Sequence, residues 1–325
     1  MMFNLKGLLM VSLAFSMSLS SCSKQDDCNS TPPENSPLPG ERNCGTMEAL
    51  AAQMQDDPGL SARMQAIESF TQNYAVNSRL LPDGTIEIPV VVNVLYKTSS
   101  QNISTAQIQS QIDVLNADFS ALNADYANTP SIFQGVGSGN TGITFVLEQV
   151  VRKATNKSSW STNNAMKKTS QGGINPTTPS THLNMWVCNM GGGILGYAQF
   201  PGGSSSTDGV VVDNNAFGNT GTVTAPYHKG RTATHEVGHW LNLRHIWGDS
   251  TCGSDQVSDT PSHNTANYGC PGYPHYSTCS GAPVEMTMNY MDYTDDACMY
   301  MFSQGQETRM KAVFAAGGPR NSFAQ

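Results

Sequence analysis

The distribution of apolar residues along the chain predicts several strands separated by helices and long polar loops. Residues 86–96 form an almost continuous β-branched run, Ile-Glu-Ile-Pro-Val-Val-Val-Asn-Val-Leu-Tyr, which is typical of a buried strand. Shorter apolar runs predict further strands at 143–151, 182–188 and 210–213. Because helical patterns lie between these strands, the order of elements favours a mixed sheet with helices packed on it.

Three segments carry the period and the end signals of helices. Ser104 and the glutamine three residues later form a capping-box signature, after which apolar residues recur at helical spacing. Residues 232–243 predict a second helix. A third begins with the same signature at Ser303 and Gln306, and we expect it to reach Ala316. The expected buried face of the first helix consists of Ile108, Ile112, Leu115, Phe119 and Leu122.

The second helix carries the sequence His-Glu-Val-Gly-His, which begins at His235. Two histidines four residues apart lie on one helical face, so His235 and His239 can reach one zinc ion, with Glu236 beside the bound water as general base. His245 can become a third ligand only if the helix stops and the chain turns back. We expect that turn at Asn242, because asparagine tolerates a positive φ best after glycine.

The segment Asn-Tyr-Met-Asp-Tyr, about fifty residues downstream, resembles the Met-turn that underlies the zinc site of metzincin proteases. Met291 is the candidate methionine. Taken alone it would indicate only core packing, since the chain holds 16 methionines. Tyr293 either directs its phenol towards the tetrahedral intermediate or packs as an ordinary tyrosine.

Residues 235–248, His-Glu-Val-Gly-His-Trp-Leu-Asn-Leu-Arg-His-Ile-Trp-Gly, resemble the pappalysins, a family of metzincin zinc metalloproteases. The resemblance covers roughly residues 40 to 316. It implies an α+β fold with a mixed twisted sheet, a backing helix, an active-site helix above a cleft and an irregular, disulfide-bonded C-terminal subdomain. It also implies catalytic Zn²⁺ and hydrolysis of protein or peptide substrates. The other motifs that carry it are 196–201, 208–212, 259–261 and 298–299.

The cysteines of the C-terminal part can be paired in three ways from the sequence alone. The resemblance to the pappalysins implies the pairs Cys252–Cys279 and Cys270–Cys298. Cys188 lies in an apolar strand and is expected to be a buried free thiol.

Cys44, in Cys-Gly-Thr, resembles the cysteine switch of the same family. Its thiolate would bind zinc in the latent enzyme and displace the catalytic water. The alternative is a cysteine that merely packs.

The N-terminal sequence predicts export and a lipid anchor. The apolar stretch before Cys22 is too short for a stable membrane span, and Leu-Ser-Ser-Cys resembles a bacterial lipobox. The alternative is a plain secretory signal with a chance cysteine. We therefore expect an exported lipoprotein at the cell surface or outside the cell. The expected segments are a lipoprotein signal peptide (1–21), a disordered tether (22–43), a pro-segment with the cysteine switch (44–78) and a metzincin catalytic domain (79–325).

Two acidic pairs are candidates for substrate and calcium binding. Asp295 and Asp296 follow the Met-turn, where metzincins build the wall of the S1′ pocket. A carboxylate there would favour Arg or Lys after the scissile bond, whereas the alternative is a solvated acidic loop. Asp255 and Asp259 lie in a loop rich in oxygen ligands that suit Ca²⁺ as a structural cofactor.

Composition limits the alternatives. Charged residues make up only 13% of the chain and the net charge is −8, which argues against nucleic acid as a partner. An adhesin built on an inactive metzincin scaffold is a second hypothesis, but such a protein need not keep Glu236. A zinc amidase of another fold is a third hypothesis, but it would share only the short motif and not His245 or Met291.

Overall fold

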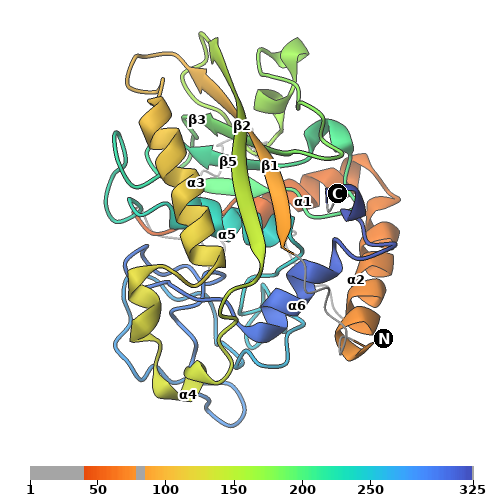
Figure 1. The fold of residues 1–325 in the computed structure, drawn as a ribbon, viewed down its shortest axis with the longest axis vertical. Coiled ribbons are helices and arrows are strands. Elements are labelled where there is room, and N and C mark those ends of the chain that lie inside the picture. The colour runs from red at the N-terminus through yellow and green to blue at the C-terminus, as the bar shows by residue number, and fades with distance from the viewer. Residues whose placement is uncertain (1–39, 78–84, 324–325) are drawn as a thin grey trace, which may run out of the picture. The chain divides into compact units, whose positions relative to one another are not determined.

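A five-stranded sheet organises the computed structural model, which describes residues 40–77 and 85–323 (Figure 1). The strand order is β2-β1-β3-β5-β4. β1 runs parallel to β2 and β3, and β3 runs parallel to β5, whereas β4 is antiparallel to β5 at the edge. The strands are β1 (Ile86–Tyr96), β2 (Ile143–Ala154), β3 (Leu183–Cys188), β4 (Gly196–Ala198) and β5 (Val210–Asp213).

Burial explains why the central strands are so apolar. Every residue of β3, β4 and β5 is buried, as are six consecutive residues of β1. A strand that is covered on both faces has a continuous run of apolar residues, and this run allows the strand to be predicted from the sequence. The mixed sheet predicted from the sequence is therefore confirmed.

The helices lie on the sheet and beside it. α3 packs against β2 and α5, and α5 packs against β4 and β5. The α-helices are α1 (Thr46–Asp56), α2 (Leu60–Asn77), α3 (Thr105–Phe119), α4 (Ser131–Gln134), α5 (Arg231–Trp240) and α6 (Gln304–Ala312). Short 3₁₀ helices span Ala124–Asn128, Ala165–Lys167, Thr169–Gln171, Ser205–Thr207 and Asn321–Phe323.

The predicted start of α3 is correct in part. The Ser104 hydroxyl accepts a hydrogen bond from the Gln107 N–H at 3.1 Å. The Gln107 side chain does not return to the cap, however, because its amide donates to the Phe217 carbonyl at 3.0 Å. The expected apolar face is buried except at Leu122, which is 79% exposed. That part of the prediction is wrong, because the helix ends at Phe119.

The other two predicted helices are shorter than the sequence indicated. α5 ends three residues before the expected end, at Trp240. α6 has the complete capping box, in which the side chains of Ser303 and Gln306 each bind the backbone of the other residue. Its regular part stops at Ala312 instead of Ala316.

The segment between α5 and α6 contains no further helix or strand within the described residues. It is held by the disulfides Cys252–Cys279 and Cys270–Cys298, the pairing that the resemblance implied. A region with little regular structure has few backbone hydrogen bonds to stabilise it, and cross-links compensate by restricting the unfolded chain. Cys188 is a buried free thiol, as predicted. These features confirm the metzincin-like α+β fold.

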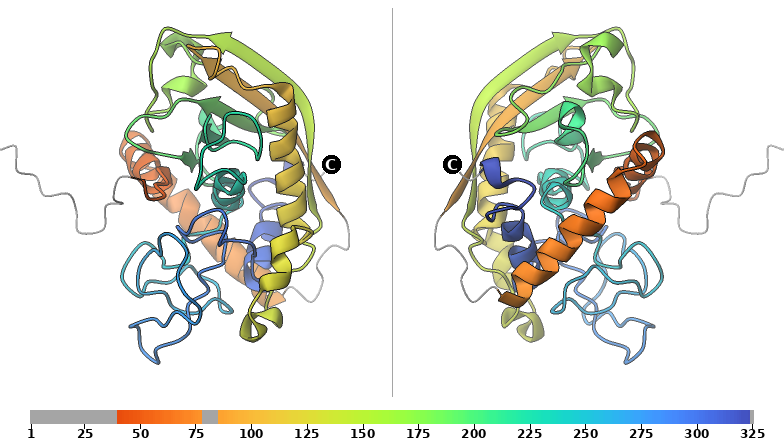
Figure 2. Two further views of the ribbon diagram at one scale, coloured as in Figure 1. Left: turned by 90° about the vertical axis from the view of Figure 1, so that its left-hand side faces the viewer. Right: turned by 90° about the vertical axis from the view of Figure 1, so that its right-hand side faces the viewer.

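Residues 46–77 form two helices that pack on the rest of the fold. α1 contacts β4, and α2 contacts α6 (Figure 2). Glu68 of α2 receives two hydrogen bonds from the Arg309 guanidinium, both of 2.9 Å. The signal peptide 1–21, the lipid site Cys22 and nearly all of the tether lie outside the described residues. In the described part, no helix is long and apolar enough to cross a membrane.

Candidate metal centre and active site

α5 and the turn that follows it bring three histidines together. His235 and His239 lie one turn apart, and their Nε2 atoms are 3.2 Å from each other. The helix then stops, and Asn242 takes φ +72°, which confirms the predicted positive value. This turn returns the chain so that the Nε2 atom of His245 lies 3.1 Å from that of His239.

Each imidazole is oriented by an acceptor on its outer side. The Nδ1 atom of His235 is 2.7 Å from the Tyr290 carbonyl, and that of His239 is 2.8 Å from the Leu243 carbonyl. The Nδ1 atom of His245 contacts the carboxylate of Asp249. Since each Nδ1 donates its hydrogen outward, all three Nε2 atoms present lone pairs to one another.

This arrangement fits zinc. Lone pairs 3.1–3.2 Å apart repel each other unless a cation lies between them, and Zn–N bonds of about 2.0–2.1 Å place tetrahedral ligand atoms at about this separation. Burial lowers the pKa of His239 to about 3, and it holds the pKa of His235 well below its ordinary value. Both rings are therefore neutral ligands. The Cys44 Sγ atom completes a group of four ligand atoms that all lie within 4.8 Å of one another.

Met291 lies beneath the helix that carries the zinc ligands. It is fully buried, and its carbonyl accepts a hydrogen bond from the Ile246 N–H at 3.1 Å. A Cβ atom on Gly238 would lie 2.5 Å from the Met291 sulfur. The glycine between the two helical histidines therefore gives the methionine room to pack directly against α5.

Glu236 is buried beside the histidines, and residues near the N-terminus contact it. The Thr46 hydroxyl donates a hydrogen bond of 2.9 Å to its Oε2 atom, and the Cys44 Sγ lies 3.5 Å from the same oxygen. Burial raises the pKa of Glu236 to about 7. A carboxyl group with such a pKa can both accept and return a proton near neutral pH.

Tyr293 lies at the same site. Its ring centroid is 5.0 Å from that of His245, and its hydroxyl donates a hydrogen bond of 3.4 Å to the carbonyl of Cys44. Burial holds its pKa well above the ordinary value, so the phenol remains a donor. The structure thus brings together the predicted metal ligands, Glu236, Met291 and Tyr293.

The two acidic residues after the Met-turn differ in their surroundings. Asp296 is completely buried, and its Oδ1 atom lies 2.6 Å from the Arg42 guanidinium. That guanidinium also donates to the Thr294 carbonyl at 3.1 Å and to the Thr232 hydroxyl at 3.2 Å. Asp295 is partly exposed, and its N–H binds the Gly269 carbonyl. Sequence reasoning missed Arg42, although its place two residues before Cys44 was a usable signal.

Asp255 and Asp259 serve different parts of their loop. The Asp255 carboxylate accepts from the Thr260 hydroxyl at 2.9 and 3.0 Å. The Asp259 carboxylate accepts from the Ser303 hydroxyl at 2.7 Å and from the Gly305 N–H at 2.8 Å, at the start of α6. Neither belongs to the group of four potential ligands described above.

The segment around Cys44 lies along the edge strand β4. The Gly45 N–H donates to the Gly196 carbonyl at 2.8 Å, and the Leu195 N–H donates to the Asn43 carbonyl at 2.9 Å. This bridge is parallel. The segment therefore crosses the site as an added strand, with Arg42 on one side of the histidines and Thr46 on the other.

The comparisons with known proteins agree with this geometry. The sequence model of the pregnancy-associated plasma protein-A family, peptidase family M43, matches residues 179–315, which include the three histidines and Met291. An extracellular metalloprotease of Arthroderma benhamiae is 31% identical over 285 residues, which are 85% of this chain and 91% of that protein.

Two solved structures from Tannerella forsythia are also similar. A promirolysin mutant is 42% identical with a TM-score of 0.80, covering 87% of this chain and 97% of that one. Mature mirolysin in complex with a cleaved peptide is 46% identical with a TM-score of 0.72, covering 75% and 97%. With its three converging histidines, adjacent glutamate and Met-turn, the chain belongs to the M43 or pappalysin family of zinc metalloproteases.

Proposed function

We propose that this protein is a secreted or surface-anchored zinc endopeptidase that is made as a zymogen, with Glu236 as general base. The observation that carries the proposal is the convergence of three histidine Nε2 atoms, the Glu236 carboxylate and the Cys44 thiol in one buried site. The histidines and Glu236 form a peptidase site, and the Cys44 thiol blocks it.

The chemistry follows from the placement of these groups. When bound by the three histidines, zinc polarises the peptide carbonyl and lowers the pKa of the attacking water to about 7. Glu236 takes the proton from that water and passes it to the leaving amine. Tyr293 donates a hydrogen bond to the developing oxyanion in place of its present bond to the Cys44 carbonyl.

Latency rests on two nearby residues, one of which blocks the metal position while the other binds the general base. Cys44 takes the position of the fourth metal ligand, and Thr46 engages the carboxylate of Glu236. Burial and the Glu236 carboxylate hold the pKa of the Cys44 thiol well above its ordinary value. A thiolate therefore forms there only where metal binding compensates for this environment.

Arg42 supports a preference for a basic residue after the scissile bond. Its guanidinium fills a buried site in which Asp296 is the acidic partner, and a substrate Arg or Lys at P1′ would make the same ion pair. In a substrate, the P1′ residue follows the scissile bond, whereas Arg42 precedes Cys44. The segment from Arg42 to Thr46 thus crosses the cleft in the direction opposite to a substrate, so none of its peptide bonds has the orientation needed for cleavage.

Several further assignments are part of the same proposal. The fungal relative is named an extracellular metalloprotease, which supports export, and the lipobox-like sequence before Cys22 supports a lipid anchor. The peptide complex of mirolysin supports protein or peptide substrates. We keep Asp255 and Asp259 as candidates for structural calcium, with backbone oxygens of their loop as further ligands.

The function is tested by separating metal binding from proton transfer. His245→Ala is expected to lose both zinc and casein cleavage. Glu236→Ala is expected to retain one zinc per chain and to cleave casein about 10²–10⁴-fold more slowly, since general-base catalysis contributes this much. Metal content is measured by atomic absorption on the same samples. Full zinc and activity in His245→Ala would contradict the assigned ligands.

Latency is tested with Cys44 and Cys188, the two free cysteines among the described residues. The Cys44→Ala precursor is expected to become active faster than wild type, because the metal position is no longer blocked. Cys188→Ala is the matched control, since Cys188 is also a buried free thiol but belongs to strand β3. The lag before casein cleavage is the measurement. Equal lags for Cys44→Ala and wild type would contradict the switch.

Self-activation is expected at the bond between Ser78 and Arg79, which lies outside the described residues. Arg79 is the only arginine between Arg63 and Arg152, and it falls between α2 and β1. Cleavage there would detach the pro-segment and release the catalytic domain from the anchor on Cys22.

N-terminal sequencing of incubated precursors tests the site of cleavage. Wild type should yield Arg79 as the new N-terminus. Glu236→Ala alone should remain intact, but it should be cut at the same bond when a trace of active enzyme is added. A new N-terminus elsewhere, or cleavage of Glu236→Ala alone, would contradict self-activation at this bond.

A further inference from the structure

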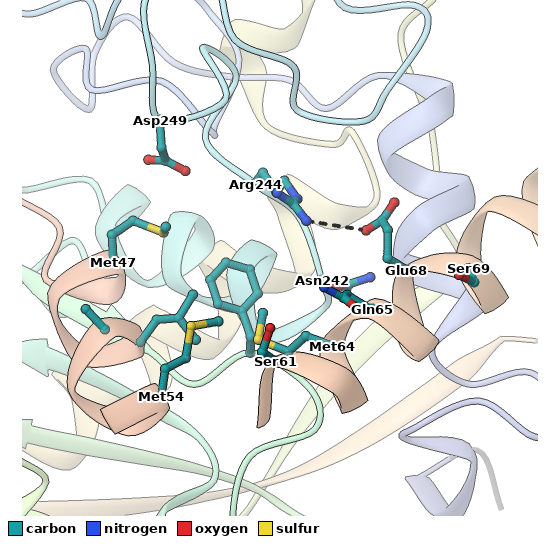
Figure 3. Close-up of a pocket in the computed structure, with 13 residues that line it drawn as sticks. Met47, Met54, Ser61, Met64, Gln65, Glu68, Ser69, Asn242, Arg244 and Asp249 are labelled. Atoms are coloured by element: carbon teal, nitrogen blue, oxygen red, sulfur yellow. Dashed lines mark ion pairs between the residues drawn. The ribbon is translucent and has the colours of Figure 1, made fainter. Parts of the chain in front are cut away.

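A cavity of about 540 Å³ lies between the two N-terminal helices and the body of the protein (Figure 3). α1 and α2 supply Met47, Leu50, Met54 and Met64, and the body supplies Phe200 and Arg244. The volume is in the usual range of small-molecule sites. Methionine side chains adapt to the shape of an apolar ligand, so this wall suits a flexible chain.

The cavity adjoins the metal centre without belonging to it. The Phe200 ring packs on His239 with a centroid distance of 5.4 Å. Asp249, also on the wall, receives the Nδ1 hydrogen of His245. A molecule in the cavity would therefore contact the side chains that support two metal ligands from behind, and would leave the cleft itself free.

Three charged groups surround the cavity, and two of them, the carboxylates, are already hydrogen-bonded. The Glu68 carboxylate accepts two hydrogen bonds from the Arg309 guanidinium, and the Asp249 carboxylate binds His245. The guanidinium of Arg244 makes no hydrogen bond to any described residue. Its nearest ionic partner is Glu68 at 3.7 Å, and 42% of its side chain is exposed. The cavity thus combines an apolar wall with one cation that makes an ion pair with Glu68 but no hydrogen bond to a described residue.

We propose that this cavity binds an amphipathic monocarboxylate, with the alkyl chain among the methionines and the carboxylate on Arg244. A guanidinium pairs with a carboxylate through two parallel hydrogen bonds, which an alcohol cannot match and a cationic head group opposes. Because α1 and α2 form much of the wall, the complete site exists only while they are docked.

Binding has a consequence for activation that rests on the proposed zymogen. A ligand that binds the docked form but not the undocked form stabilises the docked form by mass action. The carboxylate would therefore prolong latency by holding the pro-segment on the body. It would have no such effect on the mature enzyme, which lacks these helices.

Titration calorimetry on the full-length Glu236→Ala precursor tests binding without proteolysis. Decanoate is expected to bind with a stoichiometry of one. Decanol should bind at least about 10-fold more weakly, and decyltrimethylammonium should show no binding at the same site. Arg244→Gln should weaken decanoate binding by about 10-fold or more, since it removes a charge-assisted pair.

Two tryptophan variants on α1 form a matched pair. Ala51 lines the cavity, so Ala51→Trp fills it and should abolish binding. Ala52 is its exposed neighbour and does not line the cavity, so Ala52→Trp should bind decanoate as the parent does. Equal binding by both variants, or equal affinity for all three head groups, would overturn the proposal.

The effect on activation is measured with wild type. Decanoate should slow the appearance of casein cleavage by the precursor in proportion to occupancy of the cavity, and it should leave mature enzyme unaffected. Equal inhibition of mature enzyme would place the ligand elsewhere and overturn the assignment. If the precursor binds decanoate as predicted but never activates itself, the zymogen proposal fails and the binding site stands.

Discussion

The close approach of three imidazoles through their Nε2 atoms is the constraint on which the rest of the site depends. Lone pairs 3.1–3.2 Å apart are unfavourable without a cation, so the fold must hold them there. It does so with an outward acceptor for each Nδ1, with the left-handed residue Asn242 that ends α5, and with Met291 packed against Gly238. The metal site thus depends on the conformation of the backbone as well as on the identity of the ligands.

In the proposed zymogen, the N-terminal segment uses the same constraint to keep the enzyme inactive. Within five residues, it places a guanidinium on Asp296, a thiol within 4.8 Å of the ligand atoms of the three histidines and a hydroxyl on the Glu236 carboxylate. In the proposed mechanism these three contacts engage the groups for P1′ recognition, metal binding and proton transfer. The helices that follow fix this segment in place, and Glu68 joins them to Arg309 of α6. A ligand between these helices and the body would stabilise their docking and would not affect the catalytic steps directly.

Local signals made much of this predictable. The metal ligands, the positive φ of Asn242 and the capping box at Ser303 follow from residue types at fixed spacing, and all are present. Features that depend on contacts between distant parts of the chain could not be predicted from local sequence. Arg42 meets Asp296 across 254 positions, and Gln107 leaves its expected cap to bind a loop more than 100 residues away. The apolar period continued to Leu122, but nothing local marked the end of α3 at Phe119.

We propose that Cys44 binds the same zinc ion as the three histidines in the latent protein. X-ray absorption at the zinc edge measures this directly on the Glu236→Ala precursor loaded with one equivalent of zinc. We expect one sulfur at about 2.3 Å and three nitrogens at about 2.0–2.1 Å from the zinc, and the sulfur should be lost in the Glu236→Ala, Cys44→Ala double variant. A spectrum of the parent with only nitrogen and oxygen neighbours would contradict it.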